Sequence, residues 1–510
     1  MPSYHFSSRI LFFIVMVSGS CLFGHADAED GSLNLTLKQA ITMAVEKNLD
    51  VKAELYNSAM AEADIRKNSG MYDPLLSFLV NYENSTTQLP SIFLAGTPLS
   101  REKILQINPG INQLIPSGGA LGLVFDNTWN QNNSSPERGF LNDYWQSQLA
   151  LTFTQPLLKN FGRETTELNI SVAKYNKEGA LDQFKTKLID TIAQVRTQYF
   201  QLNSLREDLE VKKTSLMLAE KILNDTRAQV KAGVLPAMEI LNAQFGVASM
   251  QKNLIDAERA VKDQVDSLQV LLQLPAGGDI VPVDKPLRDE YAVDEAASIR
   301  KALTERSDLK QLLTTLKATE LQSRVAGHQT LPDLSFIASA ALTGLGKSYS
   351  RDTDKVVSGD YPIWAVGLQF SYPLGNQTAE NEYIKSKLRI GQTQTQVKSL
   401  EDTIANEVRN AVRALKSSYK QLDVTTRGSA YAEERLHAYI KKNQVGLATA
   451  KDVLDVENDL VTAKGNQIRA LADYNNAITA LWKASGELLE REGITLNQKD
   501  ADSLYEKSRD

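Results

Sequence analysis

The chain has 510 residues, of which 42% are hydrophobic and 23% are charged, and its formal net charge is -6. No basic surplus is present to neutralise phosphates, which argues against a nucleic-acid partner. After the N-terminus no uninterrupted apolar run of about 18 residues occurs, which excludes a polytopic helical membrane protein. The length suits two or three ordinary domains or one very elongated domain.

The first 28 residues have the features of a secretory signal peptide. Arg9 precedes an apolar run at residues 10–17, and the small-residue site Ala26-Asp27-Ala28 follows. This order predicts export and cleavage after Ala28, with an uncleaved amphipathic start as the alternative. The only cysteine, Cys21, lies inside this segment. Lipid attachment at Cys21 is a further alternative; otherwise the mature protein has neither disulfides nor thiol chemistry.

Two long stretches without proline are predicted to be helical. None of the 15 prolines lies between Pro156 and Pro236, and none follows Pro373. Because proline interrupts long helices, its absence permits them. Apolar residues in both stretches recur at spacings of three and four, which is typical of a coiled-coil-like amphipathic helix. A helix over residues 163–232 would be about 105 Å long at about 1.5 Å per residue, which no compact globular domain can hold.

Two proline-rich segments, at about residues 75–157 and 333–373, are predicted to form strands. In the second segment, four large apolar residues alternate with small or polar ones: Trp364, Val366, Leu368 and Phe370. This alternation suits a barrel with lipid outside and water inside, and we expect these four side chains to face lipid. A soluble sandwich would show the same alternation, so the export signal and the long helices are what favour a barrel.

The chain contains two copies of one plan. The segment "DPLLSF" at residues 73–78 corresponds to "LPDLSF" at 331–336, and "LTFTQPLL" at 151–158 corresponds to "LQFSYPLG" at 368–375. The segment "AGVLPAMEILNAQ" from Ala232 corresponds to "VGLATAKDVLDVE" from Val445. Each copy is predicted to consist of a helix, two strands, a long helix, a tight glycine turn and a shorter helix. Short helices at about residues 308–327 and 51–70 are predicted to stack end to end on the returning helices of the first and second copy.

This repeat divides the chain into a signal peptide (1–28), a first repeat (29–274), a proline-containing linker (275–292), a second repeat (293–490) and a polar C-terminal tail (491–510). The helical hairpins are predicted at residues 163–274 and 376–490.

The first repeat is longer than the second between its strands. Pro74 and Pro156 are 82 residues apart, whereas the corresponding Pro332 and Pro373 are 41 residues apart. The additional residues include the turn "PSGG" at 116–119 and an asparagine-rich segment. We expect surface loops there, with extra strands as the alternative.

With these features in this order along the chain, the sequence resembles the TolC family of outer-membrane efflux and secretion channels. The resemblance covers residues 35–490 and depends on the repeat, on "QPLLKNFGR" at 155–163, and on the two glycine turns followed by "EIL" and "DVLD". The segment "ALADYNNAITALWKASGELL" at 470–489 resembles the closing helix of that family.

The resemblance implies a mostly α fold with a β-barrel portion, formed by a homotrimer. Each protomer would supply four strands to one outer-membrane barrel and a third of a long periplasmic α-helical tunnel. The implied function is a passive exit duct for efflux or type I secretion. The implied partners are a periplasmic adaptor (membrane fusion) protein and an inner-membrane pump of the RND, ABC or MFS type. A periplasmic coiled-coil scaffold without a barrel is the alternative.

Two kinds of functional residue are implied by the resemblance. The turns at Gly233-Val234 and Gly446-Leu447 would form the tip at which the adaptor docks, since glycine reverses the chain at low cost through positive φ. Two acidic residues three positions apart share one helix face and would form a ring at the pore constriction: Asp452 and Asp455, with Glu239 and Asn242 as their first-repeat counterparts.

An ordinary structural role for these acids stays open, because two acids in the first turn of a helix also stabilise its dipole. The sequence departs from the family nearby, since Asn443 and Ala448 replace a Tyr and an Arg that join neighbouring helices there, and Met238 replaces a small hydroxyl residue. These departures put the particular closing bonds of the channel in doubt, but not the acidic constriction.

No enzyme chemistry is predicted. Outside the signal peptide only His328 and His437 occur, and neither has a second ligand or base at the spacing that metal binding or general-base catalysis needs. We find no set of nucleophile, base and oxyanion donors. We therefore expect no catalytic residues, no cofactor and no structural metal.

Overall fold

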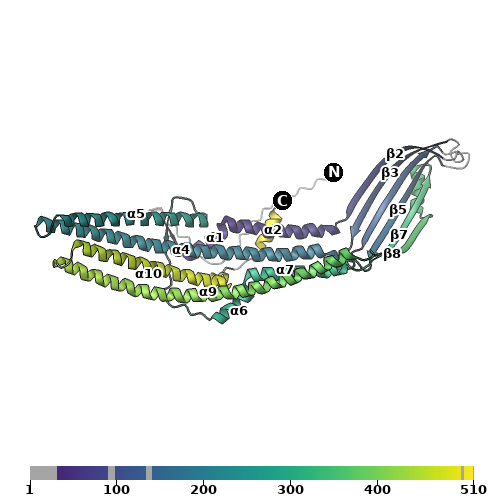
Figure 1. Cartoon of the computed structure of the whole chain (residues 1–510). Coiled ribbons are helices and arrows are strands. Elements are labelled where there is room, and N and C mark those ends of the chain that lie inside the picture. Colours follow the sequence, from purple (N-terminus) through teal and green to yellow (C-terminus); the bar gives the residue numbers. More distant parts are fainter. Residues whose placement is uncertain (1–31, 90–97, 134–140, 495–498, 509–510) are drawn as a thin grey trace.

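The computed structural model describes residues 32–89, 98–133, 141–494 and 499–508. The predicted signal peptide, residues 1–28, lies outside the described residues. The described chain is a long bundle of helices that leads into a β-sheet at one end (Figure 1). Within the described residues, no helix is both long enough and apolar enough to cross a bilayer.

Two long helices run along most of the bundle. Helix α4 (Leu168–Lys231) has 64 residues and follows the short helix α3 (Arg163–Thr166), and α9 (Gln377–Gln444) has 68 residues. At about 1.5 Å per residue each long helix spans roughly 100 Å. Side chains at the predicted spacing are buried along both helices, among them Leu188, Ile192 and Val195 of α4 and Ile404 and Val408 of α9. The predicted long helices are therefore confirmed.

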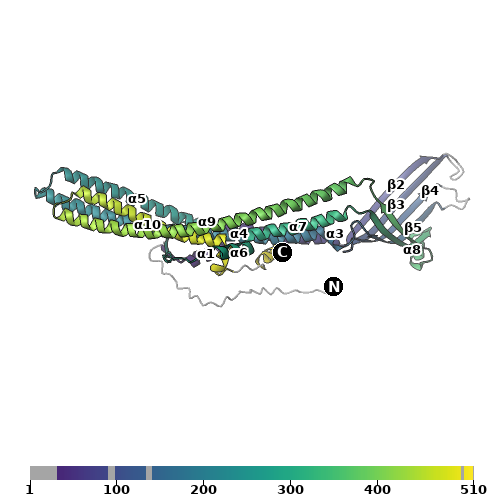
Figure 2. The ribbon, with the colours of Figure 1, turned by 60° about the horizontal axis from the view of Figure 1, so that its bottom comes forward.

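Shorter helices lie end to end beside the long ones (Figures 1 and 2). Helices α5 (Met238–Leu272) and α2 (Leu49–Ser69) pack along α4, whereas α10 (Ala450–Ala484) and α7 (Ser307–His328) pack along both α4 and α9. The bundle also contains α1 (Leu37–Lys47), α6 (Glu295–Glu305), α11 (Leu488–Arg491) and α12 (Lys499–Lys507). Helix α12 belongs to the predicted polar tail and packs on α2.

The inter-repeat linker is fastened to the middle of the bundle by hydrogen bonds to two buried tyrosines, Tyr199 and Tyr474. Strand β6 (Asp279–Pro282) pairs in parallel with β1 (Ser32–Leu35). The hydroxyl of Tyr199 donates to the Leu35 carbonyl at 2.9 Å and accepts from the amides of Val283 and Asp284 at 3.0 Å each. Further along, the Tyr474 hydroxyl accepts from the Tyr291 amide at 2.8 Å. The linker is therefore an ordered part of the bundle.

One six-stranded antiparallel sheet lies beyond the helices. In spatial order its strands are β2 (Leu75–Gln88), β3 (Leu99–Leu114), β4 (Ala120–Asn132), β5 (Asp143–Pro156), β7 (Asp333–Gly346) and β8 (Pro362–Ser371). The predicted four strands per protomer are wrong. The additional residues of the first repeat, expected to be loops, form most of β3 and β4 and the turn between them.

The two faces of the sheet differ in polarity. The strand register places large apolar side chains from all six strands on one face, here called the apolar face: Phe78, Val80, Ile107, Ile111, Leu121, Leu123, Leu149, Leu151, Phe336, Leu342, Trp364, Val366, Leu368 and Phe370. The opposite face, here called the polar face, carries mainly Asn, Gln, Thr, Ser and Gly. Because strand side chains alternate, each strand contributes to both faces.

A short helix covers the apolar face at the end remote from the bundle. Helix α8 (Tyr349–Ser358) packs against β5 and β7. Its buried Asp352 accepts hydrogen bonds from the amide (3.1 Å) and the hydroxyl of Ser147. Gly344 lies directly beneath, and a Cβ atom there would collide with the Asp352 carbonyl. Residues 343–346 form the end of β7, and the glycines there admit the helix.

Candidate functional site

Both helical hairpins turn at the end of the bundle remote from the sheet, and they turn in the same way. Two residues beyond the end of each long helix lies a glycine with positive φ, Gly233 (74°) after α4 and Gly446 (78°) after α9. The Val234 amide donates to the Gln229 carbonyl and the Leu447 amide to the Lys442 carbonyl, both at 2.9 Å. These are Schellman turns, in which glycine adopts the left-handed conformation and backbone amides satisfy the last helical carbonyls. No atom lies within 4 Å of a Cβ built at either glycine, so it is backbone conformation that requires glycine.

The second turn has additional side-chain hydrogen bonds. The Asn443 amide donates to the Ala448 carbonyl at 2.9 Å and so closes the turn on itself. The Thr449 hydroxyl accepts from the Asp452 amide at 3.1 Å, while the Asp452 carboxylate accepts from the Thr449 amide at 2.8 Å. This is a capping box. No side chain caps α5 at the equivalent position, Ala237, so the second turn is the more firmly fixed.

Asp452 and Asp455 both lie on the exposed surface of α10 near the tip. Hydrogen bonds from the backbone and the side chain of Thr449 lower the pKa of Asp452. Asp455 lies 3.6 Å from the ammonium group of Lys451. Asp452 therefore caps α10, whatever other role it has. Asp455 shares its helix face with Lys451, a cation that the sequence prediction did not consider.

The tip turns surround a cavity of about 760 Å³. Both predicted turns line it, together with Glu239 of α5 and Asp452 of α10. Glu239 is half-buried, and among the described residues its Oε2 atom has no hydrogen-bond partner although it is buried. Asp455 and Asn242 do not line the cavity. The structure thus brings Glu239 and Asp452 together with the turns, and it leaves the other two candidates on the helix surfaces beside them.

Glu457 is a buried acid that the sequence prediction missed. It lies two residues beyond Asp455, about 200° further around α10 at about 100° per residue, and it is 4% exposed. Burial raises the pKa of Glu457, whereas Ser215 of α4 and Lys464 of α10 act in the opposite sense. Lys464 itself lies 3.6 Å from Glu433 of α9. A carboxylate flanked by Val456 and Leu460 offers no periodicity signal, because helical spacing alone predicts an apolar residue there.

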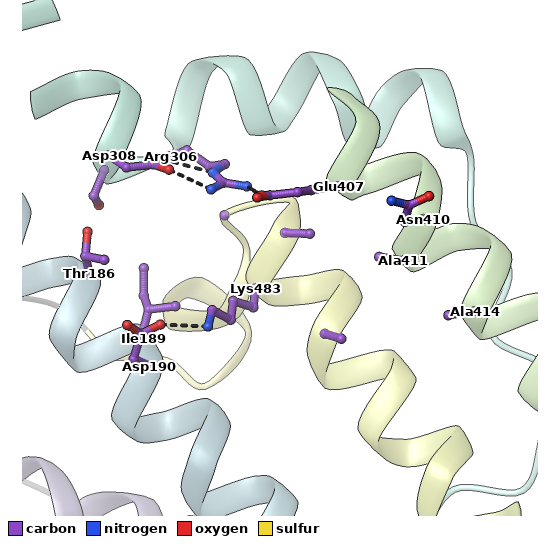
Figure 3. A pocket seen from close by; sticks show the side chains of 14 residues that line it. Thr186, Ile189, Asp190, Arg306, Asp308, Glu407, Asn410, Ala411, Ala414 and Lys483 are labelled. Carbon is purple, nitrogen blue, oxygen red and sulfur yellow. Dashed lines mark hydrogen bonds and ion pairs between the residues drawn. The ribbon is translucent and has the colours of Figure 1, made fainter. Parts of the chain in front are cut away.

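A second cavity, of about 640 Å³, lies where α10 ends and α7 begins, between α4 and α9 (Figure 3). Its charged groups are paired with one another. The Arg306 guanidinium binds both Asp308, at 2.6 Å, and Glu407, and Lys483 lies 2.8 Å from Asp190. The rest of the lining is largely small, such as Ala411 and Ala480. The cavity is a gap between stacked helices, and each of its cations already has an anionic partner.

The four strand residues predicted to face lipid lie together on β8. Trp364, Val366, Leu368 and Phe370 are each more than 60% exposed. They belong to the apolar face, so their neighbours across the strand pair are also apolar or small, including Phe336 and Ala338. Among the described residues, no group of three or more His, Cys, Asp or Glu side chains is placed to hold a metal ion.

A family model described as "Outer membrane efflux protein" matches residues 120–272 and 298–487, which together are more than half of the chain. The chain belongs to the outer membrane efflux protein family. This confirms the resemblance to TolC-like channels, and it places the protein in the outer membrane, as predicted. The two matched segments fall in the two predicted repeats.

Individual relatives agree with the family. The probable efflux pump outer membrane protein TtgC of Pseudomonas putida is 25% identical over 312 residues, which is 58% of this chain and 61% of TtgC. The chain therefore matches about three fifths of the length of that relative. Two solved structures share the fold at 15% identity. The outer-membrane channel OprN has a TM-score of 0.66, covering 88% of this chain and 90% of its own. CmeC of Campylobacter jejuni has a TM-score of 0.63, covering 92% and 89%.

Proposed function

We propose that this protein is the outer-membrane exit duct of an efflux or type I secretion system. Three copies would lie side by side, so that their sheets close a barrel in the membrane and their helices form a tunnel in the periplasm. The duct would itself be passive. A periplasmic adaptor and an inner-membrane pump of the RND, ABC or MFS type would supply the energy and choose the cargo.

One observation carries this proposal: an apolar sheet face stands at the end of a helical rod about 100 Å long. Such a face is stable only if other apolar groups cover it, because exposed apolar area on this scale is rare in soluble monomers. The opposite face is polar and suits a water-filled interior. The rod is long enough to cross much of a periplasm. A periplasmic coiled-coil scaffold does not need a sheet with one apolar and one polar face, so the sheet disfavours that alternative function.

We propose further that the tip is both the gate and the docking site. In a trimer, three copies of Asp452 and Asp455 would place six carboxylates around a narrow throat, with Glu239 and Asn242 close by. Rings of like charge focus a negative potential in a narrow pore and favour cations. The exposed Val234 and Leu447 of the two turns would meet the adaptor. The cavity that joins both turns to Glu239 and Asp452 supports a single tip site.

The membrane half of this proposal is tested by one pair of substitutions on β8. Leu368→Arg places a charge on the apolar face, which costs up to about 2–4 kcal/mol in the bilayer. Gln369→Arg, on the next residue and the polar face, is the matched control. We expect the first variant to lose detergent-stable trimers from outer-membrane fractions and the second to keep them. Equal trimer yields from the two variants would contradict lipid burial of the apolar face.

A further inference from the structure

The two strands that the resemblance did not foresee, β3 and β4, are full members of the sheet. Strand β3 pairs with β2 along fourteen residues, from Leu99 opposite Gln88 to Asn112 opposite Leu75. Strand β4 pairs with β5 along twelve, from Ala120 opposite Thr154 to Gln131 opposite Asp143. Every strand of this six-stranded sheet thus has a neighbour on both sides except β2 and β8. The extra hairpin is therefore part of the barrel wall.

The hairpin also follows the two-faced pattern of the rest of the sheet. Ile107 and Ile111 of β3 and Leu123 of β4 lie on the apolar face. Leu123 pairs directly with Leu151 of β5, and Ile107 and Ile111 each lie one same-face position away from the residue that pairs with Phe78 of β2. Side chains on the polar face of the hairpin include Gln106, Asn112 and Thr128. A loop folded over the sheet would not need this alternation. The hairpin is suited to stand in a bilayer beside the other four strands.

The turn between β3 and β4 is built into the junction of sheet and helices. The Ser117 carbonyl accepts from the Gly162 amide and from the Gln155 side chain, both at 3.0 Å. Gly118 has a φ of 86°, and a Cβ atom there would collide with the Asn160 carbonyl. Gly118 therefore combines a left-handed backbone with a close approach that other residues cannot make. The start of the α3–α4 segment is shaped to receive this turn.

The two edge strands are suited to pair with each other in neighbouring copies. Successive strands are antiparallel from β2 to β8, so with six strands β2 and β8 also run in opposite directions. Both edges are more than nine residues long and carry large apolar residues on the apolar face, such as Phe78 and Leu368. An uncovered edge of this kind is a template for strand pairing.

We propose that three copies close an eighteen-stranded barrel, with β2 of each copy against β8 of the next, whose lumen is a wide, acidic vestibule above the throat. This inference rests on the proposed trimeric channel. At a strand spacing of about 4.8 Å and a tilt of about 40°, eighteen strands give a backbone diameter of about 36 Å, against about 24 Å for twelve. Side chains narrow each by about 10 Å, which leaves about 26 Å or about 14 Å of free width.

The charge of the vestibule follows from the same register. The polar face of the described strands carries four acids, Glu83, Glu102, Asp126 and Asp333, and no Lys or Arg. The basic residues of β3, Arg101 and Lys103, lie on the opposite face beyond the apolar side chains. Three copies therefore concentrate acidic groups in the lumen, where a water-filled interior between low-dielectric walls favours cations. Cargo leaving the throat would enter a wide, cation-attracting space.

The width can be measured with a single luminal cysteine in the full-length chain. Thr152→Cys lies on the polar face of β5, and Leu151→Cys, one residue away on the apolar face, is the matched control at the same depth. Maleimide-polyethylene glycols of graded size are added to intact cells. We expect the cysteine at 152 to react with reagents of about 20 Å diameter, which fit the wider lumen and not the narrower. The cysteine at 151, facing lipid, should react with none of them.

A deletion variant gives the twelve-stranded comparison. Joining Gln88 to Asp143 through a short turn removes β3 and β4 and leaves β2 antiparallel to β5. With Thr152→Cys in this background, the largest reagent that reacts should be nearly twofold smaller in diameter. If the deletion variant does not fold, the largest reagent that reacts with the full-length chain tests the proposal by itself, because the lumen widths expected for eighteen and twelve strands differ by nearly a factor of two. A limit of about 14 Å in the full-length chain would overturn the wide barrel.

The charge is tested in the same protein. A cationic thiosulfonate should label the cysteine at 152 several-fold faster than an anionic one, and added salt should reduce the ratio because it screens the acids. The combined substitutions Glu83→Gln, Glu102→Gln, Asp126→Asn and Asp333→Asn should bring the ratio close to one. An unchanged ratio would refute the acidic vestibule. Trimers with a narrow lumen would overturn this inference alone, whereas a monomer outside the membrane would overturn the proposed channel as well.

Discussion

Tyr199 offers the sharpest test of how the bundle is held together. Its buried hydroxyl makes three hydrogen bonds, to Leu35, Val283 and Asp284. In Tyr199→Phe the Val283 amide and the Leu35 carbonyl keep each other as partners, at 3.1 Å. The Asp284 amide has no other hydrogen bond among the described residues. Leaving this partly buried amide without a partner costs about 1–3 kcal/mol, and losing a typical hydrogen bond costs about 0.5–1.5 kcal/mol. We therefore expect the linker to be destabilised by about 2–4 kcal/mol.

Native-state trypsin cleavage measures this loss directly. Arg288 is an exposed residue of the linker and can be cut once the linker opens. When opening is rapid compared with cleavage, the cleavage rate follows the equilibrium population of the open form. Because about 1.4 kcal/mol corresponds to tenfold, the Phe variant should be cut at Arg288 about 30-fold faster or more. The far-UV circular dichroism of the variant should be unchanged under native conditions.

The matched control is Tyr419→Phe. Tyr419 lies on α9, packs its ring against Tyr474 at 5.5 Å, and makes no hydroxyl hydrogen bond among those of the described residues. Its replacement should change the cleavage rate by less than about threefold, because substitutions away from such networks are usually within about 0.5 kcal/mol. Equal cleavage rates in the two variants would refute the view that the Tyr199 hydroxyl fastens the linker.

Three further outcomes are expected. The double variant Asp452→Asn and Asp455→Asn keeps side-chain size and capping ability but removes six charges per trimer. Cation selectivity in planar bilayers and block by multivalent cations should therefore both fall. Unchanged selectivity and block would leave only the capping role for these residues. Trp at Val234 or Leu447 should abolish export while trimers still form, whereas export with the adaptor still bound would place docking elsewhere. The raised pKa of Glu457 means that its ionised form opposes folding. Glu457→Gln should therefore match the wild type in urea at low pH and be the more stable protein as the pH rises through that raised pKa; a constant difference would contradict this.

The helical half of the fold was predictable because its information is local. Apolar residues at spacings of three and four fix which face of a long helix is buried, and the absence of proline allows it to continue. Gly233 and Gly446 could be identified as turns because a left-handed backbone conformation favours glycine regardless of its surroundings. The repeat then gave the order of elements, and the resemblance gave the family. Each of these features is carried by residues close together in sequence.

Other features depended on contacts between distant residues. Whether the additional residues of the first repeat were loops or strands could not be decided locally, because their asparagines and glycines suit turns, whereas their membership in the sheet depends on pairing with β2 and β5. The buried Glu457 likewise meets Ser215 of α4, and the three hydrogen bonds of Tyr199 join it to residues 84, 85 and 164 positions away. The sequence alone determined which segments are helices, where they reverse and which family they belong to. The tertiary structure decided how many strands form the wall and which polar groups are enclosed, because both depend on what each side chain meets across the fold.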